Sequence, residues 1–164
     1  MCETGSVFKG KEMALSKKVI FLALILLSQT ALADFKEDID CLAKNIYFES
    51  RNQPWVGKIA VAQVTLNRVE SMLFPSKICE VVEQIKAPQR CQFSWFCDGK
   101  SDEPFDKVEW SNSIEAALLV YPGHLPDVTE GALWYHADYI IKPRWAKHYK
   151  ETVRINEHIF YRTN

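Results

Sequence analysis

A short apolar segment near the N-terminus divides this chain into a removable leader and one folding unit. Residues 19–27 are nine consecutive apolar residues, preceded by Lys17-Lys18 and followed by Ala31-Leu32-Ala33. A positive region, an apolar region and small side chains at a cleavage site are the three parts of a secretion signal. Nine helical residues extend only about 14 Å at roughly 1.5 Å per residue, less than a bilayer core. We therefore predict cleavage after Ala33, rather than an uncleaved anchor or a buried helix.

The signal begins late, which indicates that translation starts at Met13. Residues 9–12 can be encoded by purine-rich codons of the kind found in a bacterial ribosome-binding site, so residues 1–12 are interpreted as an over-extended reading frame. The predicted organisation is a signal peptide over residues 1–33 and one domain over residues 34–164.

The predicted mature chain has 131 residues, enough for one ordinary domain. Its net charge is −3, because residues 1–33 contain four Lys and two Glu of the 20 basic and 21 acidic residues. No basic stripe remains, so nucleic acid is a poor candidate partner. No second apolar run approaches membrane length, so we expect no stable membrane insertion after cleavage.

Four cysteines, Cys41, Cys79, Cys91 and Cys97, remain in the mature chain, whereas Cys2 lies upstream of the signal. An even number in an exported domain predicts two disulfides. Four cysteines allow three pairings, and the sequence does not choose among them. The pairing we favour is Cys41–Cys79 with Cys91–Cys97. Structural zinc is the alternative. Its usual ligand pairs are two cysteines with two to four residues between them, and no two of these cysteines are that close.

Apolar residues at helical spacing predict four helices, over residues 35–51, 54–73, 76–85 and 106–121. We expect Ser76 and Asp106 to cap the last two helices. The second helix is apolar on more than one side, so it should be buried over much of its surface.

After Gly131 the pattern of residues changes, and it predicts a small β element near the C-terminus. Residues 133–136 read as a short strand, and residues 151–155 and 159–162 as a hairpin. Residues 87–104 lack periodicity and are expected to form a long functional loop. The predicted fold class is α+β, mainly helical, in a single domain.

Glu49 is the sharpest candidate for chemistry. It stands where a strongly apolar helix face ends, beside Tyr47 and Phe48. Partial desolvation of a carboxyl there would raise its pKa, which is how a Glu becomes a general acid near neutral pH. From these residues alone, a solvated helix-end Glu or an ion pair with Arg51 is the simpler interpretation.

Several motifs in a fixed order resemble the cell-wall hydrolase family typified by the spore-cortex-lytic enzyme SleB. They cover nearly all of residues 41–162: Ile46-Tyr47-Phe48-Glu49-Ser50-Arg51, Gly57, residues 60–69, residues 91–95, residues 97–99, residues 132–137, Pro143, Trp145 and residues 158–162. This resemblance implies a lysozyme-like, lytic-transglycosylase-like fold with a cleft, peptidoglycan glycan strands as partner, and a catalytic role for Glu49. No separate wall-binding repeat precedes the domain, so we expect periplasmic wall remodelling in a Gram-negative bacterium rather than germination.

The same resemblance suggests further cleft residues. Gln92, Ser94 and Trp95 stand on the cysteine-bearing loop, where an indole could stack on sugar faces and the polar groups could bind them. Tyr135 and His136 are expected to line the cleft opposite the acid. The alternatives are loop packing for the first three residues and a core histidine for His136.

Other polar residues are assigned more structural roles. Asn67 and Arg68 are expected to tie the second helix to a neighbouring loop rather than to contact substrate. Asp98 and Asp138 are the best second carboxylates, although Asp98 followed by Gly99 is equally good turn chemistry.

We therefore expect a peptidoglycan-cleaving enzyme, a lytic transglycosylase in which Glu49 is the single acid and base for the MurNAc–GlcNAc β-1,4 bond. No metal or other cofactor is required by this chemistry. Two alternatives stay open: a zinc amidase cutting the muramoyl–alanine bond, and a non-enzymatic wall-binding or inhibitor protein.

Overall fold

The computed structural model describes the backbone of residues 17–164 and the side chains of residues 29–164. The interpretations placed on Met1, Cys2 and Met13 lie outside these residues, as do the side chains of residues 19–27. The chain divides into two units, residues 1–34 and residues 35–164. The predicted cleavage after Ala33 lies one residue before this boundary and stays a prediction. Within the described part of the chain, no helix is both long and apolar enough to cross a membrane.

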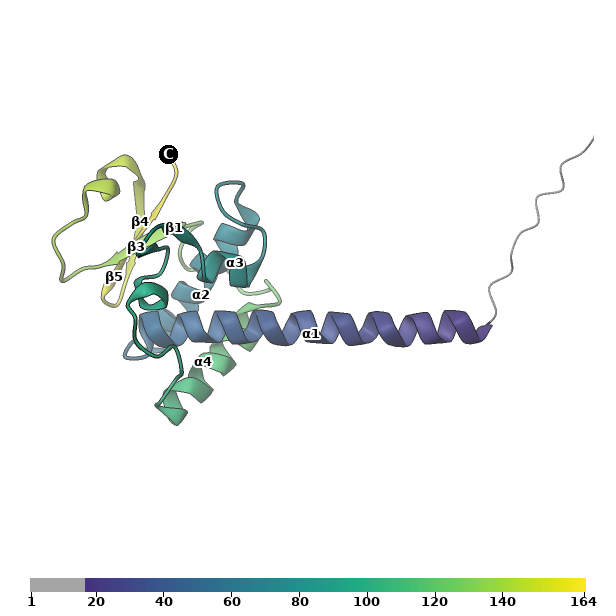
Figure 1. Ribbon diagram of the computed structural model, residues 1–164. Helices are drawn as coiled ribbons and strands as arrows, with labels where there is room; N and C mark the ends of the chain where they lie inside the picture. Colours follow the sequence, from purple (N-terminus) through teal and green to yellow (C-terminus); the bar gives the residue numbers. More distant parts are fainter. Residues whose placement is uncertain (1–16) are drawn as a thin grey trace, which may run out of the picture. The chain divides into compact units, whose positions relative to one another are not determined.

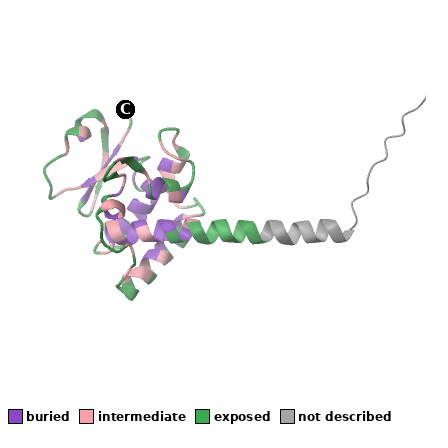
Figure 2. Ribbon diagram, in the orientation of Figure 1, coloured by how far each residue is buried: buried purple, intermediate pink, exposed green. Residues whose placement is uncertain are grey.

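Four α-helices and two short 3₁₀ helices make up about half of the residues that the structure describes (Figure 1). They are α1 (Lys17–Ser50), α2 (Trp55–Glu70), α3 (Ile78–Val82), η1 (Ser94–Cys97), α4 (Lys107–Val120) and η2 (Arg144–His148). Along α1, the described side chains are exposed through residue 37 and become buried from Ile39 onward (Figure 2). The packed core therefore begins well inside this helix.

Two helix ends follow the predicted physical signals. Pro54 precedes the first residue of α2, where its fixed φ and missing N–H are compatible with a helix start. The Asp106 carboxylate accepts hydrogen bonds from the backbone N–H groups of Val108 and Glu109, and so caps α4 as predicted. After α4, Gly123 adopts a left-handed φ of 71°.

Other helix ends differ from the prediction, including the start of α1, which is at Lys17 rather than residue 35. Helix α3 begins at Ile78 after Lys77, with no side-chain cap, so the predicted cap by Ser76 is wrong. It is a single turn of five residues that ends at Val82, because the chain then turns into a strand. Helix α2 ends at Glu70, three residues before the predicted end.

Two antiparallel sheets complete the fold. The larger one has the strand order β3-β5-β4, with β3 (Trp134–Ala137), β4 (Lys150–Ile155) and β5 (His158–Arg162). The predicted C-terminal hairpin is confirmed, and its turn includes Asn156 at a φ of 51°. A smaller hairpin pairs β1 (Ile85–Ala87) with β2 (Arg90–Cys91). Residues 87–104 are thus more ordered than the predicted loop, because they contain part of this hairpin and η1.

Helix α2 is the centre of the packing and is buried nearly all round, as predicted. Ile59 and Ala62 belong to a core shared with α1, α3, α4 and η1. Ala60 and Val64 belong to a second cluster, with Ala132 and Phe160 from the sheet region. The mainly helical α+β class is therefore confirmed, with α2 separating a helical layer from a small sheet.

The turn between β4 and β5 approaches α2 at a glycine. A Cβ placed on Gly57 would lie 2.7 Å from Asn156 Nδ2 and 2.9 Å from Gln53 Cβ. Gln53 Nε2 also donates a hydrogen bond of 2.7 Å to the Glu157 carboxylate. The absence of a side chain at Gly57 thus permits the hairpin to contact the start of the helix.

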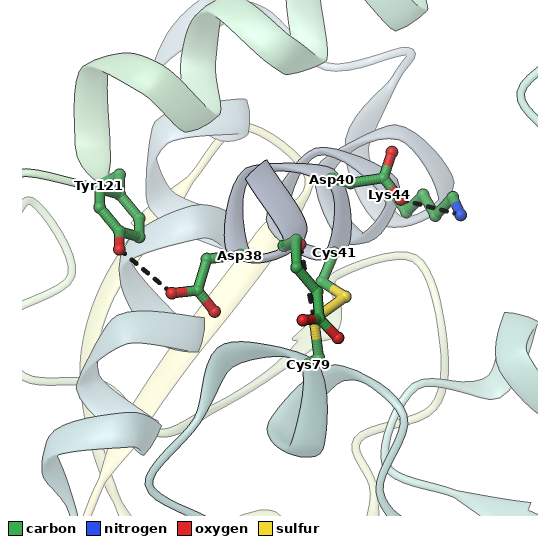
Figure 3. The surroundings of a disulfide bond; sticks show 7 residues. Asp38, Asp40, Cys41, Lys44, Cys79 and Tyr121 are labelled. Atoms are coloured by element: carbon green, nitrogen blue, oxygen red, sulfur yellow. Dashed lines mark hydrogen bonds and ion pairs between the residues drawn. A yellow bond between two sulfur atoms is a disulfide. The ribbon is translucent and has the colours of Figure 1, made fainter. Parts of the chain in front are cut away.

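Both favoured disulfides are present. Cys41–Cys79 joins α1 to α3, with a Cα–Cα distance of 5.3 Å, as Figure 3 shows. Nearby, the Tyr121 hydroxyl at the end of α4 donates a hydrogen bond of 3.1 Å to Asp38 of α1. Cys91–Cys97 closes the short loop between β2 and the end of η1.

We predict that the two disulfides stabilise the fold unequally. Cys41–Cys79 spans 38 residues and Cys91–Cys97 spans 6. Since the entropy removed from the unfolded chain grows with loop length, replacing each pair by Ala should lower the free energy of unfolding by about 4 and about 2 kcal/mol, respectively. Denaturant unfolding of the two double variants measures this difference. Equal losses, or free thiols in the oxidised wild-type protein, would contradict it.

Candidate active site

The last turn of α1 ends on a buried ammonium group. Lys58, from α2, is only 4% exposed. Its Nζ donates to the carbonyl oxygens of Ser50 at 3.1 Å and Arg51 at 2.5 Å, and pairs with Glu109 at 2.7 Å. A cation at a helix C-terminus satisfies carbonyls that have no partner within the helix and complements the helix dipole. This contact fixes the turn that carries Glu49.

One turn earlier, a fully buried amide connects α1 to two further elements. Asn45 Nδ2 donates to Thr65 Oγ1 at 3.0 Å, and Asn45 Oδ1 accepts from Trp95 Nε1 at 3.2 Å. Residues four apart lie on the same side of a helix, so Asn45 and Glu49 share one face of α1. The face bearing the candidate acid is therefore bonded to α2 and η1.

Glu49 is half-buried, and its carboxylate accepts a hydrogen bond of 3.0 Å from the Tyr135 hydroxyl on β3. Burial raises the pKa of Glu49, and the hydrogen bond from Tyr135 and the positive charge of Arg68 oppose part of that rise. Burial, together with the Glu49 charge, holds the pKa of Tyr135 well above 10, so the hydroxyl stays a proton donor. The result is a carboxyl group whose proton is retained to higher pH than in water.

Arg68 remains a cation despite its burial. Burial lowers the pKa of its guanidinium to about 10, and the nearby Tyr135 and Glu49 oppose that decrease. Its Nε donates to the carbonyl oxygen of Leu133 at 2.8 Å. This bond holds the end of α2 against the start of β3, so the cation and the acid have a fixed relation.

A cavity of about 910 Å³ opens beside Glu49. Its walls come from α1, α2, the β1–β2 hairpin, η1, β3 and η2. They include Glu49, Arg68, Lys86, Arg90, Gln92, Ser94, Asp98, Trp134, Tyr135, Trp145 and Tyr149. Its volume lies within the ordinary range of ligand-binding pockets.

Four of the predicted site residues, Glu49, Gln92, Ser94 and Tyr135, line this cavity together. Gln92 Oε1 is buried there without a hydrogen-bond partner. An unpaired acceptor in a cavity wall is available to a ligand N–H or hydroxyl group. Residues of the cysteine-bearing loop and the acid therefore line one cavity.

The other two predicted residues do not line it, and the expectation that they face the cleft is corrected. Trp95 is buried, stacks on Phe48 at 4.7 Å between ring centroids, and uses its N–H on Asn45. His136 is buried, with its ring nitrogens 2.8 Å from the Ala137 carbonyl and 3.1 Å from the Tyr161 hydroxyl. Trp134 and Tyr135 on the same strand both line the cavity, whereas the contact of His136 with Tyr161 holds the His136 ring against β5.

Three aromatic residues that we did not predict as site residues line the cavity instead. The rings of Trp134 and Tyr149 stack with centroids 3.8 Å apart, and Trp145 lies 6.1 Å from Tyr149. Flat apolar faces of this kind suit the faces of sugar rings. The signal in the sequence was the density of aromatic residues across positions 134–149, but nothing in their spacing indicates which rings meet.

The remaining polar predictions divide clearly. Asn67 Nδ2 donates to Asp127, Thr129 and the Ala132 carbonyl at 3.0–3.2 Å, so its predicted tie to a loop is confirmed. Asp98 lines the cavity, whereas Asp138 pairs with Arg154 and is not among its lining residues. Asp98 is therefore the only one of the two predicted second carboxylates at the cavity.

The fold that carries this half-buried acid and aromatic-walled cavity is mainly helical and lysozyme-like. A family model described as Cell Wall Hydrolase matches residues 52–161, which begin three residues after Glu49. The chain belongs to this family. The predicted resemblance is thus confirmed.

Its relatives share both sequence and fold. The spore cortex-lytic enzymes of Oceanobacillus iheyensis and Bacillus subtilis are each 32% identical over 126 and 124 residues, 76% and 75% of this chain. These matches cover 41% and 37% of the two enzymes, so the chain spans about two fifths of their length.

Two solved structures have the same fold. The catalytic domain of the germination-specific lytic transglycosylase SleB from Bacillus anthracis matches with a TM-score of 0.62 and 30% identity, over 76% of this chain and 93% of that one. The catalytic domain of Bacillus cereus SleB gives 0.59 and 28%, over 77% and 91%.

We predict that Glu49→Gln stabilises the folded protein at neutral pH. Because burial raises the pKa of Glu49, the folded state holds this proton more tightly than the unfolded state does. Stability is therefore lost as pH rises from the unfolded pKa through the folded one. Gln carries no charge, so the gain should be present at pH 7 and vanish in acid. The free energy of unfolding, measured from pH 4 to 8, tests this prediction. Glu80→Gln is the control, because Glu80 is an exposed residue of α3. A gain in stability that does not depend on pH would contradict the prediction.

Proposed function

We propose that this chain cleaves the glycan strands of peptidoglycan as a lytic transglycosylase, with Glu49 as its single acid and base. The observation that carries the proposal is the Glu49 carboxyl at the cavity wall, half-buried and held by the Tyr135 hydroxyl. Burial favours its protonated form, which is the form that a general acid requires. Family membership and the similarity to the catalytic domain of the lytic transglycosylase SleB from Bacillus anthracis support the same chemistry.

The proposed reaction needs one carboxyl group. Glu49 protonates the oxygen linking MurNAc C1 to GlcNAc, and that C1–O bond breaks. The C6 hydroxyl of the same MurNAc forms the new bond to C1, and its proton passes to the Glu49 carboxylate. Water is not consumed, and Glu49 ends protonated as it began. Tyr135 and Arg68 stabilise the carboxylate between the two proton transfers.

Different residues of the cavity wall suit the apolar and the polar parts of the glycan. Trp134, Trp145 and Tyr149 offer flat faces for sugar rings, and Gln92 offers an unpaired acceptor for an N-acetyl N–H or a hydroxyl group. Such contacts align the C6 hydroxyl with C1, which contributes to rate by positioning.

The alternatives gain no observation in their favour. Among residues 29–164, no three His, Cys, Asp or Glu side chains are grouped so that they could hold a metal ion, as a zinc amidase would require. A non-enzymatic wall-binding protein would need the cavity but not an acid held in its wall.

We also propose that the chain is exported and acts in the periplasm of a Gram-negative bacterium. The proposal rests on the predicted signal before Asp34 and on two disulfides, which form in oxidising compartments. The named relatives come from Bacillus and Oceanobacillus, so they do not bear on this location.

Glu49→Gln should abolish cleavage while preserving binding. Gln keeps the size and the hydrogen bond from Tyr135 but delivers no proton, and general acid–base catalysis is typically worth about 10²–10⁴-fold. The variant should therefore sediment with purified wall sacs and release almost no fragments. Mass spectrometry of wild-type products should show 1,6-anhydromuramic ends, one water lighter than hydrolysis products.

Two outcomes would contradict these assignments. A variant that keeps more than about a tenth of wild-type activity would exclude Glu49 as the acid, since general acid–base catalysis contributes more than that. Reducing ends that incorporate labelled oxygen from solvent would indicate a muramidase. Asp98, which lines the cavity, would then be the second carboxylate to replace.

Tyr135→Phe should move the pH profile in a defined direction. The lost hydrogen bond lowers the pKa of Glu49 in the wild type, so its removal raises that pKa further. Since the acid must be protonated to react, the alkaline limb of kcat/KM should shift to higher pH. Tyr139→Phe is the matched control, because Tyr139 is 74% exposed and outside the cavity wall. A shift to lower pH, or the same shift in the control, would contradict the assignment.

A further inference from the structure

Two cations of the cavity wall lie over one aromatic ring, that of Phe74. Arg68 Cζ lies 5.1 Å and Lys86 Nζ lies 5.7 Å from the centroid of the Phe74 ring. Lys86 stands on β1, and Arg90 on the paired strand β2 adds a third cation to the same wall. Like charges held this close repel one another unless a negative charge lies between them.

The ion pairs within 4 Å among the described residues involve Lys44, Lys58, Lys100, Lys142 and Arg154, and none of the three wall cations. Asp98, one of the two acids in the wall, already pairs with Lys100 at 3.4 Å. Glu49, the other acid, acts electrostatically on Arg68, but it is held by Tyr135 and burial favours its protonated form. Lys86 and Arg90 therefore face the cavity without an ion-pair partner among the described residues, and Arg68 forms no ion pair within 4 Å.

Arg68 adds an independent sign of a missing partner. It is only 3% exposed, and its Nη1 is buried without a hydrogen bond, although its Nε is bonded to Leu133. A buried charged donor without a partner is costly, so such groups in a cavity wall usually meet a ligand. Guanidinium N–H groups match the geometry of a carboxylate.

We propose that Arg68, Lys86 and Arg90 form a subsite for a carboxylate carried on the muramic acid side of the glycan strand. This inference rests on the proposed function, because it assigns the anion to the same substrate. The sugar rings themselves are neutral, and their hydroxyl and N-acetyl groups do not require three cations. The anionic groups of such a strand are the free lactyl carboxylate of a stripped muramic acid and the carboxylates of a stem peptide, and both have the same recognising chemistry.

The subsite makes the enzyme selective for charged over neutral strands. Lys86 and Arg90 are exposed hairpin residues with no hydrogen bond to the core, so they can be replaced without unfolding the chain. Arg68 is buried and bonded to Leu133, so its replacement would confound selectivity with stability. The hairpin pair is therefore the right place to test.

The experiment compares kcat/KM on three strand preparations. The first has intact stem peptides, the second is stripped by an amidase to free lactyl carboxylates, and the third has its carboxylates amidated with a carbodiimide and an amine. Wild-type enzyme should cleave at least one charged preparation about tenfold or more faster than the neutralised one, as expected for charge-assisted hydrogen bonds. In the double variant Lys86→Gln/Arg90→Gln this ratio should fall towards one. Which charged preparation carries the preference identifies the source of the carboxylate.

The matched control is Lys77→Gln/Lys107→Gln, which removes two exposed charges away from the cavity and should keep the wild-type ratio. Equal cleavage of all three preparations by the wild type would overturn the subsite and leave the proposed function intact. An unchanged ratio in the hairpin variant would also overturn it. If the wild type releases nothing from any preparation, the proposed function itself fails.

Discussion

The buried ammonium of Lys58 is the contact on which the rest of the site depends. It belongs to α2, closes the carbonyl end of α1, and pairs with Glu109 on α4, so one charge joins three helices. A cation so deeply buried is tolerated only because all its donors are used. Glu49 lies one residue before the end of α1, so the place where that helix stops also determines where the acid stands.

Burial has opposite consequences for the fold and for the site. It stabilises the apolar faces of α1 and α2, but it raises the pKa of Glu49 and leaves Arg68 with an unpaired donor. Both groups would be more stable in water. A chain selected for stability alone would place neither there, so these two exceptions to good packing mark the region where a ligand is expected.

The fold could be predicted from sequence further than the site could. Apolar periodicity located the four α-helices that the structure describes, and Asp106 capped α4, because these signals act within a few residues. Ser76 failed as a cap because helix α3 begins one residue later than its spacing indicated. A one-turn helix carries too little periodicity to fix its own ends.

The candidate acid was identified, but its aromatic surroundings were not. Glu49 belongs to a local motif, whereas the facing of Trp95 depends on Asn45, fifty residues earlier. His136 and Tyr135 are neighbours on β3, but Tyr135 bonds to Glu49 at the cavity and the His136 ring contacts Tyr161 on β5, so the shared motif did not place both at the cavity. Side-chain direction is set by contacts between elements far apart in sequence, and spacing along the chain does not contain it.

The approach of the β4–β5 turn to Gly57 has a mechanical consequence. That turn belongs to the three-stranded sheet β3-β5-β4, and strand β3 of this sheet holds Tyr135 against the acid. A side chain at Gly57 would force the Asn156 amide and Gln53 to shift, next to a turn that is joined to Tyr135 through the paired strands β5 and β3. The missing Cβ of one glycine therefore lets the start of α2 lie close to the same sheet that carries the hydroxyl bonded to the acid.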